Sequence, residues 1–99
     1  MVTFKINNHL KDFSSGNLAV HCPSNDLAKE FLGGLKTRGY TWSFGDSLEE
    51  EDTRHHVYRE LTCYSYNKVT CNPGVCYSPI WYYQGLVSYT VVEFKGWDA

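Results

Sequence analysis

A segment with helical periodicity is the feature that most constrains what this chain can fold into. Its apolar residues recur at the three- and four-residue spacing of one helix face: Leu27, Ala28, Phe31, Leu32 and Leu35. Ser24 or Asn25 can cap the first turn, and Gly39 offers the left-handed residue that commonly ends a helix. We therefore predict a helix over residues 24–38.

Short strand-like runs flank this helix. Residues 18–22 are apolar with a β-branched centre and lie between Gly16 and Pro23, and residues 40–44 follow the helix directly. The two runs predict a strand–helix–strand opening. Residues 1–16 alternate at first and then become polar, which predicts an edge strand or an arm.

The second half of the chain carries mainly strand signals. Residues 57–67 alternate, which predicts a strand with a tyrosine-lined face. Residues 68–71 are its expected hairpin partner, before a Pro-Gly turn at 72–74. Residues 78–85 form a short aromatic segment, and the β-branched residues 86–94 predict a central strand.

Length and composition favour one globular domain. The chain has 99 residues, of which 42% are hydrophobic and 20% charged, enough for one core and too few for two. We predict a single α+β domain over residues 1–99, with one main helix packed on a mostly antiparallel sheet of four or five strands. No run approaches the roughly 18 apolar residues of a membrane span. The start lacks a signal-peptide layout, so we expect a cytoplasmic protein without membrane contact.

The four cysteines are expected to be reduced in that compartment, which favours metal binding, catalysis or burial over disulfides. Cys71 and Cys76 flank the Pro-Gly turn at the spacing of zinc knuckles. With Cys63 and Cys22 they would form a structural zinc site that stabilises a small core. Three histidines could replace a cysteine ligand: His21, His55 and His56. The alternative is that the cysteines are buried or exposed thiols without a metal.

Catalysis has little support in the sequence. Adjacent His55 and His56 would point to opposite faces of a strand and would not serve one site. A Cys–His pair, such as Cys63 with His21 or His55, needs an oxyanion hole and an orienting group. No motif indicates either, so we predict that the protein is not an enzyme.

An acidic run occupies the loop predicted at residues 45–54. It contains Asp46, Glu49, Glu50, Glu51 and Asp52. Such a run is often a solvated loop, but it could also mimic phosphates and occupy a basic channel of another protein. The formal net charge of −2 argues against direct nucleic-acid binding as the main task.

Aromatic residues are unusually frequent: eight Tyr, five Phe and three Trp. Tyr and Trp suit recognition surfaces because they combine a large rigid area with a polar group. We predict that Tyr64 and Tyr66 lie on a partner-binding face. With Trp81 they could also form a stacking platform for a nucleotide or a single-stranded nucleic acid.

Seven blocks of the sequence are similar to a recurrent small protein of phages and prophages of Gram-positive bacteria. They are residues 18–22, 28–32, 39–42, 45–48, 62–64, 80–83 and 89–94. The pair of Cys71 and Cys76 is an addition to that pattern. The blocks contain no catalytic signature, so the resemblance implies a fold and a phage origin.

Small acidic phage proteins include many inhibitors of bacterial defence. By this analogy the chain resembles an anti-CRISPR protein that blocks a Cas9-type nuclease, the CRISPR effector of the host cell. The basic guide and target channels of such a nuclease could accept an acidic, tyrosine-rich partner. A hydrolytic zinc site is a third class of function, and the oligomeric state is open.

Overall fold

One mixed β-sheet with helices on both faces forms the fold. The computed structural model describes residues 2–3, 6–43, 45–49, 51–67 and 73–97. The strands are β1 (Val2–Thr3), β2 (Leu18–His21), β3 (Thr62–Asn67), β4 (Gly74–Pro79) and β5 (Thr90–Glu93). The helices are α1 (Ile6–Ser14), α2 (Asn25–Thr37), α3 (His55–Tyr58) and α4 (Ile80–Gln84), with a 3₁₀ turn η1 at Arg59–Leu61.

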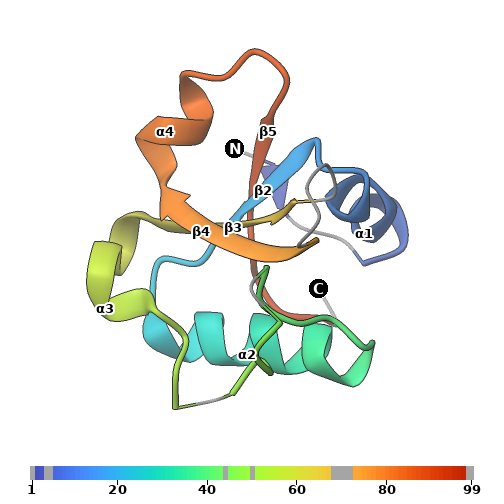
Figure 1. Ribbon diagram of the computed structural model, residues 1–99. Helices are drawn as coiled ribbons and strands as arrows, with labels where there is room; N and C mark the ends of the chain where they lie inside the picture. Colours follow the sequence, from blue (N-terminus) through green and yellow to red (C-terminus); the bar gives the residue numbers. More distant parts are fainter. Residues whose placement is uncertain (1, 4–5, 44, 50, 68–72, 98–99) are drawn as a thin grey trace.

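The strand order in the sheet is β1-β5-β2-β3-β4. Strand β3 pairs antiparallel with both β2 and β4, whereas β5 lies between β1 and β2 and is parallel to both. Helix α2 covers one face, and the much shorter α4 lies over the other (Figure 1). The predicted class, an α+β fold with one main helix on a mixed, mostly antiparallel sheet, is confirmed.

Helix α2 begins and ends where the sequence pattern indicates. The Ser24 hydroxyl caps it by accepting a hydrogen bond from the backbone N–H of Leu27 at 3.2 Å. Asp26 lies in the first turn and Lys36 in the last, which complements the helix dipole. The apolar face is buried against the sheet, so local pattern and tertiary packing agree.

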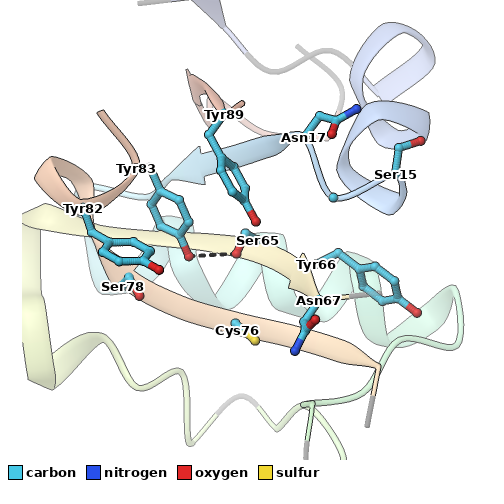
Figure 2. Close-up of a pocket in the computed structure, with 11 residues that line it drawn as sticks. Ser15, Asn17, Ser65, Tyr66, Asn67, Cys76, Ser78, Tyr82, Tyr83 and Tyr89 are labelled. Carbon is cyan, nitrogen blue, oxygen red and sulfur yellow. Dashed lines mark hydrogen bonds between the residues drawn. The ribbon is translucent and has the colours of Figure 1, made fainter. Parts of the chain in front are cut away.

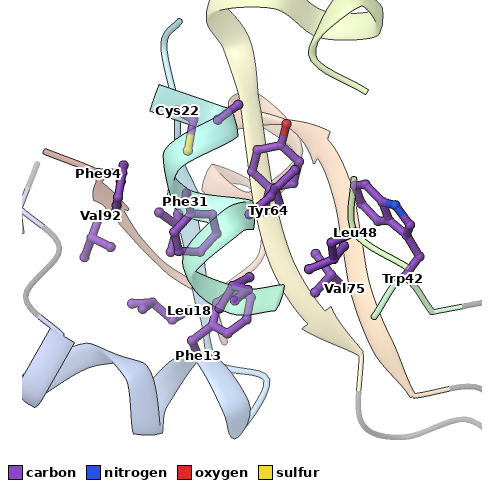
Figure 3. Packing of buried hydrophobic residues seen from close by; sticks show 14 residues of the cluster. Phe13, Leu18, Cys22, Phe31, Trp42, Leu48, Tyr64, Val75, Val92 and Phe94 are labelled. Atoms are coloured by element: carbon purple, nitrogen blue, oxygen red, sulfur yellow. The ribbon is translucent and has the colours of Figure 1, made fainter. Parts of the chain in front are cut away.

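Aromatic rings fill the core between α2 and the sheet (Figure 3). Phe31 is at its centre, with ring centroids 5.6 Å from Phe13, 5.1 Å from Phe94 and 6.0 Å from Tyr64. Trp42, Phe13, Phe94 and Tyr64 are all almost fully buried. A large part of the aromatic content therefore serves packing.

The predicted strand–helix–strand opening is wrong. In residues 40–43, Thr41 and Trp42 form only isolated bridges, to Ser47 and Val75, and the strand that follows α2 in the sheet is β3, antiparallel to β2. Trp42 gives the physical reason why residues 40–43 do not form the predicted strand. Its side chain is 1% exposed, and its burial beside β4 holds residues 40–43 against the edge of the sheet.

Three further expectations need correction. Residues 6–14 form α1, which the alternating start of the chain concealed, although β1 is the predicted edge strand. Residues 57–61 belong to α3 and η1, so the predicted strand at 57–67 begins only at Thr62. The strand predicted at 86–94 is also shorter, because β5 begins only at Thr90. Helix α4 lies in the aromatic segment, and the hairpin partner predicted at 68–71 lies outside the described residues.

Adjacent glycines in α2 provide a matched test of packing. A Cβ at Gly33 would meet nothing within 4 Å, whereas a Cβ at Gly34 would overlap the indole of Trp97. That indole stacks on Phe31 at 5.6 Å and donates a hydrogen bond to the Glu30 carbonyl at 2.8 Å. Trp97 therefore cannot move aside without losing both contacts.

We expect Gly33→Ala to raise the free energy of unfolding by about 0.5–1 kcal/mol, because it removes backbone entropy from the unfolded chain. Gly34→Ala should lower it by about 1–3 kcal/mol through overpacking against Trp97. Urea unfolding of the two variants measures the difference. Equal stability of the two would contradict the close approach at Gly34.

The described part of the chain is nearly isometric, with a radius of gyration of 12.0 Å. None of its helices is both long and apolar enough to cross a membrane.

Candidate ligand-binding pocket

The face of the sheet opposite α2 is only partly covered. Ala19, Cys63 and Tyr83 form a small buried cluster there, under α4 and the residues that lead into β5. Because α4 has only five residues, it leaves part of β3 and β4 open. The result is a pocket of about 400 Å³ between α4, the two strands and the end of α1 (Figure 2).

Eleven residues from five segments line this pocket: Ser15, Gly16, Asn17, Ser65, Tyr66, Asn67, Cys76, Ser78, Tyr82, Tyr83 and Tyr89. They include four phenols, two amides, three hydroxyls and one thiol. None of these described lining residues is charged. The pocket is thus a neutral environment with many hydrogen-bonding groups and aromatic walls.

Strand alternation places the small polar residues in the pocket. Ser65 and Asn67 project to the open face, because successive side chains of β3 alternate between the two faces. Cys76 is opposite Ser65 in the β3–β4 register, and Ser78 is opposite Cys63. The floor of the pocket therefore consists of short side chains, which leaves space above the strands.

Tyr83 connects helix α4, which forms one wall of the pocket, to strand β3 in its floor. Its hydroxyl and the Ser65 hydroxyl are 2.7 Å apart, and either can be the donor (Figure 2). Burial raises the pKa of Tyr83 to about 12, against the smaller opposing effect of its hydrogen bonds to Ser65 and Ser78. The phenol therefore stays protonated and neutral at physiological pH.

The wall rings are inclined to one another. Tyr82 and Tyr83 have centroids 5.2 Å apart at 80°, and Tyr83 and Tyr89 are 5.0 Å apart at 57°. Rings at these angles contact each other by their edges rather than by parallel stacking. They form a corner in which aromatic surface faces the pocket from more than one direction.

The structure does not bring the described cysteines to one point. Cys22 lies in the core beneath α2, Cys63 lies in the cluster on the opposite face, and Cys76 lines the pocket. Burial raises the pKa of Cys22 well above its usual value, with a smaller effect of Cys63, and burial raises that of Cys63 to about 12. Both thiols are therefore protonated and inert.

Cys71 lies outside the described residues. Within the described ranges, no group of three or more His, Cys, Asp and Glu side chains is placed to hold a metal ion. The structural zinc site stays a prediction.

The three candidate histidines have different surroundings. A ring nitrogen of His21 is 2.6 Å from the Glu60 carbonyl, and one of His55 is 2.9 Å from the Cys22 carbonyl. Carbonyl oxygens only accept, so both imidazoles act as donors that fix the backbone. His56 is exposed. His55 and His56 belong to the short helix α3 rather than to a strand, and His55 is buried whereas His56 is exposed.

The acidic loop is at the surface. Asp46, Glu49, Glu51 and Asp52 are exposed, and Glu50 lies outside the described residues. Two of these carboxylates have cationic partners within the chain. Lys36 is 3.1 Å from Glu49, and Arg54 is 3.3 Å from Asp52.

The two predicted surface tyrosines have different positions. Tyr64 is fully buried, and its hydroxyl donates to the Thr53 carbonyl at 2.5 Å, so its assignment to a partner-binding face is wrong. Tyr64 projects toward α2, because alternation along β3 puts it on the helix-covered face. Tyr66 is half-buried and lines the pocket.

Fold and pocket together define a small α+β protein with a neutral, tyrosine-rich cavity on the open face of its sheet. Comparison with protein families, curated proteins and solved structures finds no match for this chain. The pocket residues come from five separate segments, so the sequence alone did not group them. The aromatic segment at 78–85 was the one signal that pointed toward this wall.

Proposed function

We propose that this is a binding protein whose pocket on the open sheet face holds a small uncharged ligand. The observation that carries the proposal is the lining: four tyrosines and six small polar or amide side chains around about 400 Å³, with no charged group among them. Ligand sites of this size combine aromatic surface with a few polar groups that fix orientation. Charged ligands would lose hydration in the pocket without gaining an ion pair.

Binding without catalysis fits the chemistry of the lining. The hydroxyls of Ser15, Ser65 and Ser78 and the thiol of Cys76 are potential nucleophiles. Activation of a nucleophile needs an adjacent base, and the described lining residues include no histidine, carboxylate or lysine. The Tyr83 phenol has a pKa too high to act as a base near neutral pH.

The residues of this pocket differ from those of the stacking platform that the sequence predicted. Tyr64 is buried, and Trp81, 65% exposed, lies outside the pocket lining. Tyr66 remains, joined by tyrosines of α4 and by Tyr89. A single-stranded nucleic acid needs cations along its backbone, which this lining does not supply.

Neighbouring aromatic residues on α4 provide the test. Tyr82 lines the pocket, whereas Trp81 does not, and both side chains are exposed. We expect Tyr82→Ala to weaken ligand binding about tenfold through loss of an aromatic contact. Trp81→Ala should bind as the unaltered protein does.

The measurement is ligand-observed NMR with a panel of uncharged heterocycles, nucleosides and sugars. Both variants remove exposed side chains, so their folding stability should change by less than about 0.5 kcal/mol. If no compound binds, or if the two variants bind equally, the pocket is not the ligand site.

We also propose, as a second candidate, inhibition of a Cas9-type nuclease by stoichiometric binding. The exposed carboxylates of Asp46, Glu49, Glu51 and Asp52 favour it, together with the resemblance to phage inhibitors. Such a segment complements the basic channels of a nuclease that binds guide RNA and target DNA.

We expect the double variant Glu49→Lys, Glu51→Lys to bind a Cas9-type nuclease at least about tenfold more weakly, because two attractive charges become repulsive. The ion pair of Glu49 with Lys36 is half-exposed, so losing it should cost the fold little. Asp12→Lys, at an exposed position in α1, is the matched control. Isothermal titration calorimetry gives the affinities. An unchanged affinity of the double variant would mean that the acidic segment is not part of the interface.

A further inference from the structure

An aromatic corner borders the pocket on the α4 side. Tyr82, Tyr83 and Tyr89 meet there at steep angles (Figure 2). The Tyr66 ring packs instead against Phe13 and Tyr40. Phenol rings that meet at steep angles offer both faces and edges to a guest. A flat aromatic guest gains dispersion contacts and quadrupole contacts from such walls.

An amide side chain supplies paired hydrogen-bonding groups at the same pocket. Asn17 follows α1, and its amide carries one acceptor oxygen beside one donor nitrogen, a pair that matches the adjacent donor and acceptor atoms on the edge of a nucleobase. The Ser78 hydroxyl donates to the Tyr77 carbonyl at 2.7 Å, and the Ser65 hydroxyl shares a hydrogen bond with Tyr83. Both serine oxygens can therefore still accept a hydrogen bond from the N–H groups of a base.

The absence of charge among the described lining residues limits which ligands the pocket can bind. The described lining residues carry no lysine, arginine or histidine that could neutralise a phosphate. A phosphate brought to this pocket would lose water without an ion pair in return. The pocket therefore discriminates against a phosphorylated form of the same ligand.

From these three features we infer that the ligand is a free nucleobase or an uncharged nucleoside. The inference rests on the proposed function and names its ligand class. The inclined tyrosines of the α4 side hold the flat base, Asn17 and the serines bind its polar edge, and the neutral lining prefers the nucleoside to its nucleotide.

Cys76 provides a reporter inside the pocket. Its thiol is partly exposed and lines the cavity, whereas Cys22 and Cys63 are fully buried. In a Cys71→Ser variant, Cys76 is then the accessible cysteine among those that the structure places. Its rate of alkylation by iodoacetamide, followed by mass spectrometry, measures occupancy of the pocket directly.

The probes are adenine, adenosine, cytidine, adenosine monophosphate and glucose. We expect at least one base or nucleoside to slow alkylation of Cys76 about tenfold at a concentration nine times its Kd, because the unoccupied fraction of the protein equals 1/(1 + [L]/Kd). Adenosine monophosphate should protect less than adenosine at equal concentration. Adding Tyr82→Ala, with its tenfold weaker binding, should reduce protection at the same concentration to about twofold, and adding Trp81→Ala should preserve it.

Four outcomes would overturn the inference. Protection by glucose alone, or equal protection by adenosine and its monophosphate, would overturn the ligand class but leave a ligand pocket in place. Protection that Tyr82→Ala leaves undiminished would show that the probes bind elsewhere. No protection by any probe would overturn the inference, and the broader NMR panel then decides whether the proposed function falls with it.

Discussion

Replacing Phe31 by alanine is expected to lower the free energy of unfolding by about 3–5 kcal/mol, the range for large aromatic-to-alanine changes in cores. Phe31 is fully buried, and its ring contacts Phe13, Phe94 and Trp97 at centroid distances of 5.1 to 5.6 Å. Its removal leaves a cavity that α2 cannot close, because the helix is held by its whole apolar face. Small domains have only about 5–15 kcal/mol of stability in total, so this variant should be largely unfolded in mild denaturant.

The matched control is Val57→Ala, at an apolar side chain that is 46% exposed. It should change stability by less than about 0.5 kcal/mol, since little buried surface is lost. Urea unfolding followed by circular dichroism gives both values. A loss below about 1 kcal/mol for Phe31→Ala would mean that the aromatic cluster is not the centre of the core.

The second large effect is expected at Gly74. A Cβ at this position would lie 2.5 Å from the Trp42 carbonyl oxygen and 2.6 Å from the backbone of Ser43. These atoms cannot rotate away as a side chain can, so one strand segment must separate from the other. We expect Gly74→Ala to cost about 2–3 kcal/mol, near the upper part of the range for overpacking.

The loss of stability in Gly74→Ala would arise where residues 41–43 bond to Val75 of β4. The Val75 N–H donates to the Thr41 carbonyl at 2.8 Å, and the Ser43 N–H donates to the Val75 carbonyl at 3.1 Å. Separation of the segments would weaken both hydrogen bonds and expose Trp42. Hydrogen exchange should then show lost protection at Ser43 and Val75 before global unfolding.

Gly85→Ala is the control for this glycine. A Cβ at Gly85 would have ordinary contacts at 3.6 Å, and the backbone φ there is −81°, which alanine adopts without strain. Its stability should therefore change by less than about 0.5 kcal/mol. If Gly74→Ala is as stable as Gly85→Ala, the segment around Trp42 does not pack on β4 as described.

The zinc site and the nuclease-binding surface stay predictions, because Cys71 and Glu50 lie outside the described residues. The buried positions of Cys22 and Cys63 favour a packing role for these two thiols.

The amino-acid sequence by itself determined the elements whose signal is local. Helix α2 needs only apolar spacing, the Ser24 cap and the following glycine, and all three lie within one segment. The run at 18–22 is similarly bounded by a glycine and a proline. The α+β class followed from these elements and from the β-branched residues near the end of the chain.

Only the tertiary structure decided where side chains with the same local signal would lie. Tyr64 and Tyr66 lie on the same face of β3, yet Tyr64 is fully buried beneath α2, whereas Tyr66 near the strand end is half-buried and borders the pocket. Strand pairing also set Cys76 opposite Ser65, and the short α4 left that floor open. Burial depends on which elements pack against each face, and those contacts join residues far apart in the chain.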